Sequence, residues 1–159
     1  MPIYMKIDSI NGEVTAAGYE KWIDVSSLQF GIGRAISTPV GGGSKRESGH
    51  PSISEITLSK QFDTASIDLF SWSTAGASKL VKIDMVQTGD KDKVSAYLHF
   101  ELTNTLISGY SMSSGGDKPS ESLSLNFTKI TEKYIPYDSD NKAGQPIVKG
   151  YDLTTAKTV

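Results

Sequence analysis

Apolar and polar residues alternate in several short stretches of the chain, and this two-residue period is typical of β-strands with one buried face. The longest alternation runs from Val94 to Thr103. Asn11-Gly12 and residues 113–117 carry turn signals between such stretches. Strands are therefore predicted at residues 3–8, 22–32, 56–62, 80–87, 94–103 and 123–127.

The alternation changes phase near the end of this series. Ile130 falls on the opposite parity from Phe127. A one-residue slip of this kind moves side chains to the other face of a strand. The sequence therefore predicts either a β-bulge or a strand whose two faces are both buried beyond Phe127.

One short helix is predicted after the strand at residues 56–62. Asp63 or Thr64 can cap its free amides. Ile67 and Phe70 lie three residues apart and share one face, with Leu69 beside them.

Residues 37–52 form the longest stretch without apolar periodicity. Their glycines and prolines make an ordered backbone costly. Loops longer than about 12 residues are uncommon inside a domain and are usually functional or disordered. We therefore expect an extended, flexible loop here and look to it for function.

These elements together predict a mostly β fold, an antiparallel two-sheet sandwich or barrel with one short flanking α-helix. A chain of 159 residues can bury roughly two-thirds of its unfolded surface around one core. Residues 1–159 are therefore expected to form a single domain.

Charge and cysteine content exclude several classes of function. The 16 basic and 18 acidic residues leave a net charge of -2, which gives no drive toward nucleic acid or anionic membranes and little repulsion between copies. The chain contains no cysteine, so disulfides, thiolate metal sites and cysteine nucleophiles are excluded. The start lacks the signature of a secretory leader, and no run approaches about 20 apolar residues, so we expect synthesis in the cytoplasm without membrane insertion.

Candidate chemical motifs fail on residue order. Residues 41–45 lack the glycine directly before lysine that a phosphate-binding loop needs. Residues 138–142 begin like a calcium loop, but a lysine stands at the fifth ligand position. His50 and His99 have no partner nearby in the sequence. We therefore predict no enzymatic activity, no cofactor and no metal.

Small polar residues occupy the outward phase of one predicted strand. Ser27 and Gln29 alternate with Leu28 and Phe30. Such a face can be solvent-exposed, or it can line a wet surface that contacts partners weakly. Trp22 and Trp72 could stack against sugars, but their apolar neighbours favour a place in the core or an interface.

Several stretches together resemble the haemolysin-coregulated protein family, whose members are tube subunits of bacterial type VI secretion systems. They are Ile3-Tyr4-Met5-Lys6-Ile7-Asp8 with Gly12-Glu13, Trp22-Ile23-Asp24-Val25, the glycine-rich loop after Ile36, and Ser124-Leu125-Asn126-Phe127-Thr128-Lys129-Ile130. The resemblance runs through nearly the whole chain in consistent order.

This resemblance implies a structural protein. It implies a barrel of two sheets with a flanking helix, six copies in a ring, and rings stacked into a tube inside a contractile sheath. It also implies a VgrG-like spike partner at the tip, effectors inside the ring, and export by the machine itself without a cleavable signal peptide.

The resemblance also assigns two surfaces. The loop would reach a neighbouring subunit or ring, and its residues are Pro39, Val40, Gly41, Gly42, Gly43, Lys45, Arg46 and Glu47. Ser27 and Gln29 would face the lumen and contact effectors, although the family's residue at Gln29 is smaller. The alternative function is a small-ligand or carbohydrate-binding β-barrel, which would stay monomeric and be stabilised by sugars or lipids.

Overall fold

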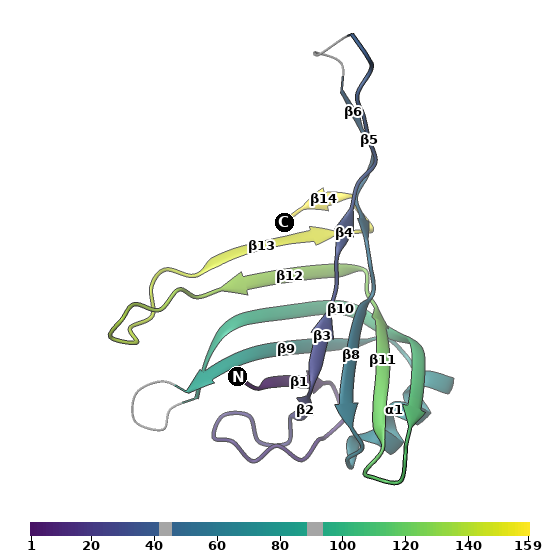
Figure 1. Ribbon diagram of the computed structural model, residues 1–159, viewed down its shortest axis with the longest axis vertical. Helices are drawn as coiled ribbons and strands as arrows, with labels where there is room; N and C mark the ends of the chain where they lie inside the picture. Colours follow the sequence, from purple (N-terminus) through teal and green to yellow (C-terminus); the bar gives the residue numbers. More distant parts are fainter. Residues whose placement is uncertain (42–45, 89–93) are drawn as a thin grey trace.

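Two antiparallel β-sheets pack face to face in the computed structural model, which describes residues 1–41, 46–88 and 94–159 (Figure 1). The wide sheet runs in the order β2 (Ile23–Val25), β1 (Ile3–Ile7), β9 (Lys79–Thr88), the first half of β10 (Val94–Ser113), β12 (Lys129–Tyr134), β13 (Ile147–Asp152) and β14 (Lys157–Thr158). The narrow sheet runs in the order second half of β10, β11 (Ser120–Asn126), β8 (Ile56–Gln61) and β3 (Ser27–Gln29). The predicted two-sheet sandwich is confirmed, and it is not closed into a barrel.

Strand β10 belongs to both sheets. It pairs with β12 up to Thr103 and with β9 up to Thr105, and from Leu106 it pairs with β11. Between these halves the pairing register shifts, and Asn104 adopts a left-handed conformation with φ of 51°, which asparagine tolerates better than most residues. The prediction ended this strand at Thr103 because its alternation is interrupted at this corner.

A second corner explains the phase change between Phe127 and Ile130. The chain leaves the narrow sheet after Asn126 and enters the wide sheet at Lys129. Phe127 and Ile130 are both buried on opposite sides of this corner. The predicted bulge or doubly buried strand is therefore wrong, because the chain changes sheets here: Phe127 directly follows β11, whereas Ile130 lies in β12.

The core lies between the two sheets and is filled by their inward side chains. The fully buried apolar residues from both sheets include Met5, Ile7, Ile23, Ile56, Leu58, Ile83, Leu102, Leu123 and Leu125. Nearly all of them occupy the inward parity that the alternation predicts.

Helix α1 (Ala65–Thr74) packs beside β10 and near the end of β8. The Asp63 carboxylate accepts a hydrogen bond from the Ala65 amide at 3.0 Å, so Asp63 supplies the predicted cap. Leu69 and Trp72 are buried, which confirms the core position of Trp72. Ile67 and Phe70 share a face as their spacing indicates, but that face points outward, with exposed fractions of 66% and 58%.

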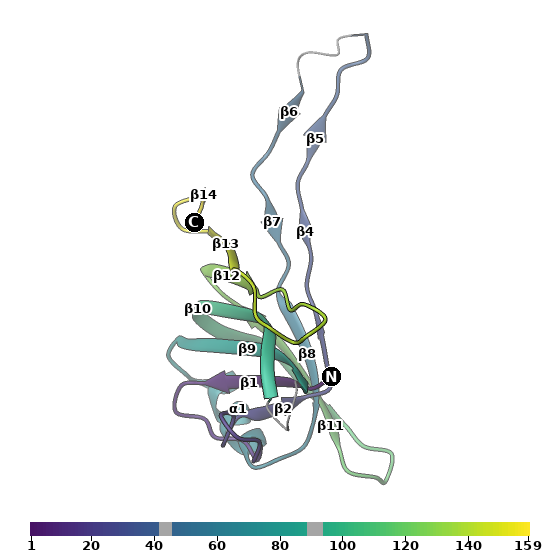
Figure 2. The same ribbon diagram turned by 90° about the vertical axis from the view of Figure 1, so that its left-hand side faces the viewer.

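A long arm, residues 32–41 and 46–53, projects away from both sheets (Figures 1 and 2). Its two sides pair as β4 (Ile32–Gly33) with β7 (Ser52–Ile53) and as β5 (Ile36–Ser37) with β6 (Glu47–Ser48). The segment predicted as a loop from residue 37 to 52 is extended and contains these ladders. Two-residue strands are too short to produce a recognisable alternation, so the glycines and prolines of this segment led to the prediction of a loop.

Candidate functional site

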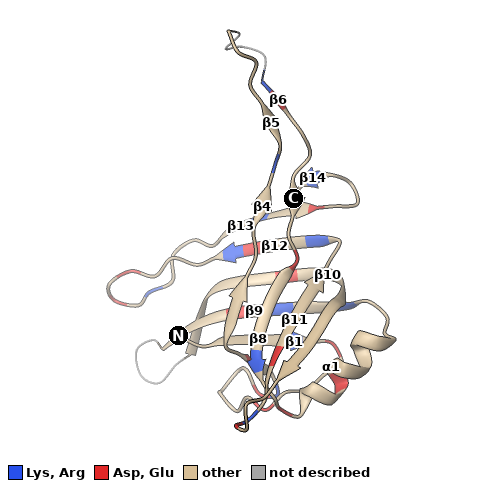
Figure 3. Ribbon diagram, turned by 45° about the vertical axis from the view of Figure 1, so that its right-hand side comes forward, with Lys and Arg blue, Asp and Glu red and all other residues tan. Residues whose placement is uncertain are grey.

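Small uncharged side chains cover the outer face of the narrow sheet. The register places Ser27 beside Ser59 and Ser122, and the next row places Gln29 beside Thr57 and Ser124. We call this the polar face; its residues are Ser27, Gln29, Thr57, Ser59, Ser122 and Ser124. Charged positions recur along β9 and β12 of the wide sheet, whereas β3 has none (Figure 3).

Two residues of the polar face, Ser27 and Gln29, were candidates from the sequence alone. Both are exposed, and the Ser27 hydroxyl hydrogen-bonds the Ser59 hydroxyl across β3 and β8. The four other members were missed. The alternation on the predicted strands indicates that these side chains face outward. Only the pairing register shows that they lie beside Ser27 and Gln29.

Both sides of the narrow sheet end in open strand edges within the described residues. Strand β3 pairs only with β8, and the second half of β10 pairs only with β11. Because each neighbouring pair is antiparallel, β3 and the second half of β10 run in opposite directions. Unpaired edges of this kind are templates for pairing with another chain.

The arm carries the other candidate residues, and those that the structure describes are exposed. Pro39, Val40 and Gly41 are exposed, and Gly41 adopts φ of 82°, a conformation that glycine accepts readily. The Arg46 guanidinium donates to the Thr38 hydroxyl at 3.2 Å across the arm, and Glu47 pairs with Ser37. Gly42, Gly43 and Lys45 lie outside the described residues.

A buried ion pair ties the narrow sheet to the helix. Lys60 of β8 and Glu121 of β11 are 1% and 2% exposed. The Lys60 ammonium lies 2.8 Å from Glu121 Oε1 and 3.0 Å from Asp63 Oδ1. Ser66 of α1 and Tyr110 of β10 also donate to the Glu121 carboxylate. This network fixes the start of α1 against the sheet.

The network shifts the pKa values of its acidic members. Burial and the hydrogen bond to Glu121 raise the pKa of Tyr110 to about 12. Burial alone would raise the pKa of Glu121, but hydrogen bonds from Lys60, Ser66 and Tyr110 outweigh it and hold that pKa below its usual value. Both shifts favour an ionised Glu121 at neutral pH.

Acid titration should reveal how much the ionised Glu121 carboxylate contributes to folding stability. The pKa of Glu121 is lower in the folded than in the unfolded protein, so its contribution to stability is complete above about pH 4.3, the unfolded value. It is lost as the pH falls through the folded pKa. Urea midpoints measured from pH 6 downward should therefore fall more steeply in the native protein than in a variant that lacks both Lys60 and Glu121; parallel curves would contradict the shift.

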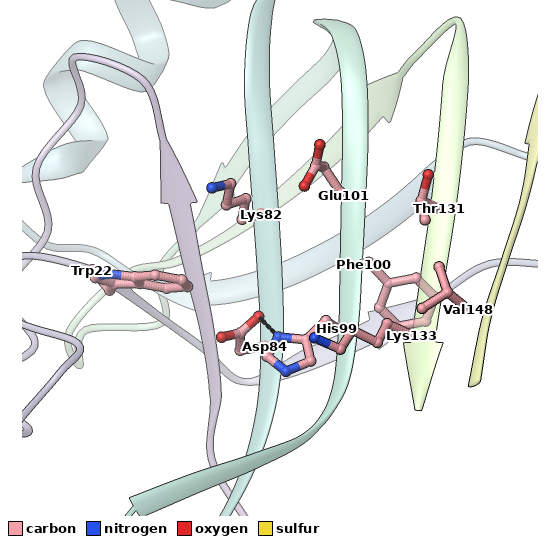
Figure 4. Close-up of a pocket in the computed structure, with 9 residues that line it drawn as sticks. All are labelled: Trp22, Lys82, Asp84, His99, Phe100, Glu101, Thr131, Lys133 and Val148. Carbon is pink, nitrogen blue, oxygen red and sulfur yellow. Dashed lines mark hydrogen bonds and ion pairs between the residues drawn. The ribbon is translucent and has the colours of Figure 1, made fainter. Parts of the chain in front are cut away.

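A second polar cluster lies on the outer face of the wide sheet, in a hollow of about 480 Å³ (Figure 4). His99 Nδ1 lies 2.7 Å from Asp84 Oδ1, and the Tyr19 hydroxyl donates to Asp84 Oδ2 at 2.9 Å. Burial, followed by the nearby Asp84 carboxylate, raises the pKa of Tyr19. No residue near His99 in the sequence was a candidate partner; the partner Asp84 comes from the neighbouring strand β9.

This cluster holds the loop between β1 and β2 against the wide sheet. Both carboxylate oxygens of Asp84 are engaged, and Tyr19 lies in the loop between β1 and β2. The bonds therefore fasten that loop to the sheet. Within the described ranges, no group of three or more His, Asp or Glu side chains could hold a metal ion. In the same ranges, no helix has the length and apolar character needed to span a bilayer.

Comparison with known proteins gives one family. Residues 4–134 match the family model described as Type VI secretion system effector, Hcp. A solved structure described as that of a type six secretion system protein is 30% identical, with a TM-score of 0.88 and 99% coverage of both chains. No curated protein matches the chain.

Two further solved structures share the fold at lower identity. Hcp1 from Salmonella typhimurium is 23% identical with a TM-score of 0.79, covering 99% of this chain and 98% of its own. The secreted protein Hcp3 from Pseudomonas aeruginosa is 17% identical with a TM-score of 0.63, covering 95% of this chain and 97% of its own.

Proposed function

We propose, because this chain belongs to the Hcp family of type VI secretion systems, that six copies of it close into a ring and that stacked rings form a tube carrying effectors. Proteins of this family are secreted structural tube subunits that oligomerise, and they are not enzymes. The observation that carries the ring proposal is the pair of open edges on the narrow sheet.

Ring closure would join these two edges. With β3 of one copy beside the second half of β10 of the next, the new pair is antiparallel like every pair inside the sheet. Each copy contributes four strands, so the direction of the strands alternates without a clash around the ring. Such an interface joins two different patches, and interfaces of this kind generate rings when their rotation closes.

The polar face would then line the lumen. Its hydroxyl and amide groups offer hydrogen bonds without charge, and each neutral hydrogen bond contributes only about 0.5–1.5 kcal/mol net. A wall of this kind holds cargo weakly and lets proteins of different shape pass. Gln29 would extend furthest from it, since the other five residues are serine or threonine.

The remaining partners follow from the family assignment. We place a VgrG-like spike at the end of the tube, a contractile sheath around it and effectors inside, with synthesis in the cytoplasm and export without a cleavable signal peptide. The alternative of a ligand-binding barrel lacks a specific supporting observation, because apolar side chains such as Met5, Leu58 and Ile83 fill the space between the sheets.

Electron micrographs of the purified protein and of Gln29→Arg test both parts of this function. We expect uniform annuli from both, since Gln29 is exposed at the sheet's outer face. Effector binding to Gln29→Arg should weaken by at least about tenfold, roughly 1.4 kcal/mol, because the lumen gains a ring of cations. Gln29→Ser is the matched control and should bind as the native protein does.

Two outcomes would contradict the proposal separately. Monodisperse monomers at high protein concentration would contradict the proposal that six copies form a ring. If Gln29→Arg forms intact annuli that still stabilise every candidate effector, Gln29 does not contact effectors in the lumen.

A further inference from the structure

The hollow on the outer face of the wide sheet contains more polar groups than the attachment of the β1–β2 loop uses (Figure 4). We call it the sheet hollow. Lys82, Glu101 and Lys133 line it, and none of the three forms an ion pair within the described part of the chain. Its volume of about 480 Å³ lies in the range of roughly 300–1,000 Å³ that small-molecule sites occupy.

The pairing register brings these side chains into two neighbouring rows. Lys82 of β9 lies beside Glu101 of β10 in one row, and His99 of β10 lies beside Lys133 of β12 in the next. His99 and Glu101 are two residues apart on one strand, so both face the same side of the sheet. Ammonium, carboxylate and imidazole groups therefore share one patch.

Trp22 gives the sheet hollow an aromatic wall. It is partly exposed, whereas Trp72 is buried. Figure 4 shows Trp22 on one side of the hollow and Val148 on the other, with Asp84 between them. The ring of Tyr19 makes a T-shaped contact with Trp22, with centroids 4.8 Å apart. The hydrogen bond from Tyr19 to Asp84 therefore also holds the indole in place.

A sugar has the chemistry that this combination of groups can bind. A pyranose ring presents C–H groups on its faces, which pack against an aromatic ring, and hydroxyl groups around its rim. The ammonium groups of Lys82 and Lys133 only donate hydrogen bonds, and the ionised carboxylate of Glu101 only accepts them. Hydroxyl groups donate and accept, so one sugar can pair with all three side chains.

The charges favour a sugar that carries a carboxylate. The two ammonium groups without an ion pair outnumber the single such carboxylate, that of Glu101. Lys82 lies directly beside Glu101 in the register, whereas Lys133 lies between His99 and Val148, neither of which is acidic. A carboxylate on the ligand would give Lys133 a charge-assisted hydrogen bond, which is stronger than a neutral one.

We propose that the sheet hollow binds an acidic saccharide, with a uronic acid ring against Trp22, its carboxylate facing Lys133 and its hydroxyl groups bonded to Lys82 and Glu101. The site lies outside the two packed sheets, so the apolar core does not block it. It also lies on the side of the molecule away from the polar face, because the two sheets pack face to face. The inference therefore goes beyond the tube function and does not need a ring.

Isothermal titration calorimetry of the purified protein tests the site with uronic acid trisaccharides, one of galacturonate and one of glucuronate. We expect saturable binding of at least one of them. Its methyl ester should bind at least about tenfold more weakly, because esterification removes the negative charge and keeps the rings. Acetate should bind more weakly still, since it has no ring to pack against Trp22.

Each opposite result would overturn the proposal. Failure of both trisaccharides to bind would exclude an acidic saccharide as the ligand. Equal affinity for the ester would show that Lys133 does not recognise a carboxylate. Acetate that bound as tightly as the trisaccharide would show a simple anion site.

Two variants locate the binding in the sheet hollow. Lys133→Gln and Trp22→Leu should each weaken binding by at least about tenfold. Lys133 is only half-buried, so its variant should fold even if Trp22→Leu does not. Lys149→Gln is the matched control, because Lys149 follows Val148 on β13 and faces the other side of the sheet. Native affinity in Lys133→Gln would contradict the site, and absence of rings in the native protein would leave these results unaffected.

Discussion

Replacing Lys60 with methionine is expected to lower the free energy of unfolding by about 3–5 kcal/mol, which is a large part of the roughly 5–15 kcal/mol that stabilises a typical domain. The loss arises because Glu121 would stay buried without its cation. Urea unfolding followed by circular dichroism measures it. Lys82→Met, at an exposed position on β9, is the matched control and should change stability by less than about 0.5 kcal/mol.

A double variant distinguishes the ion pair from a simple loss of packing. Lys60→Met/Glu121→Leu removes both charges, and buried pairs replaced by apolar residues of similar volume often keep their stability. We therefore expect the double variant to be more stable than Lys60→Met alone. If the two losses simply added, the charge of Glu121 would not be the cause.

Shortening the arm is expected to abolish stacking while leaving the folded domain intact. The variant joins Ser37 to Glu47 through Asn-Gly, a two-residue turn suited to the antiparallel pair that these residues already form. Every described residue removed is exposed, so stability should change by less than about 1 kcal/mol. Sedimentation and electron micrographs should show single rings in place of tubes.

A matched variant separates the length of the arm from its chemistry. Replacing residues 38–46 with a glycine-serine segment of equal length preserves the reach and removes Val40 and Arg46. We expect it to lose stacks as the shortened arm does. Stacks of native length from either variant would contradict a role of the arm in the stacking of rings.

The sequence predicts the sheets well wherever one face of a strand is buried along its whole length. It does not predict corners, since a corner depends on which sheet the next residues join. Thus the alternation stops at Thr103 although β10 continues to Ser113. Phe127 and Ile130 look out of phase because Phe127 directly follows β11, whereas Ile130 lies in β12 of the other sheet.

Side-chain partners are the other part that the sequence cannot supply. Lys60 shares the parity of buried Leu58, but only the pairing of β8 with β11 brings Glu121 to it. His99 meets Asp84 for the same reason. Helix α1 has apolar residues on two faces, so its spacing alone does not decide whether Phe70 or Trp72 is buried.

The candidate surfaces were predicted in part. Outward parity identified Ser27 and Gln29, and the lack of apolar periodicity identified the arm. The other four residues of the polar face were missed, because their position beside Ser27 and Gln29 depends on the pairing of β3, β8 and β11. The tube function itself came from family resemblance.

In the tube that we propose, strand β10 would have a mechanical consequence if a contracting sheath pushed the tube. Its first half belongs to the wide sheet and its second half forms one edge of the proposed inner wall. Force applied to the body of a subunit therefore reaches the wall along a covalent backbone as well as through side-chain packing. The two layers cannot slide past each other without bending that strand at Asn104, so each subunit should travel as one rigid element under load.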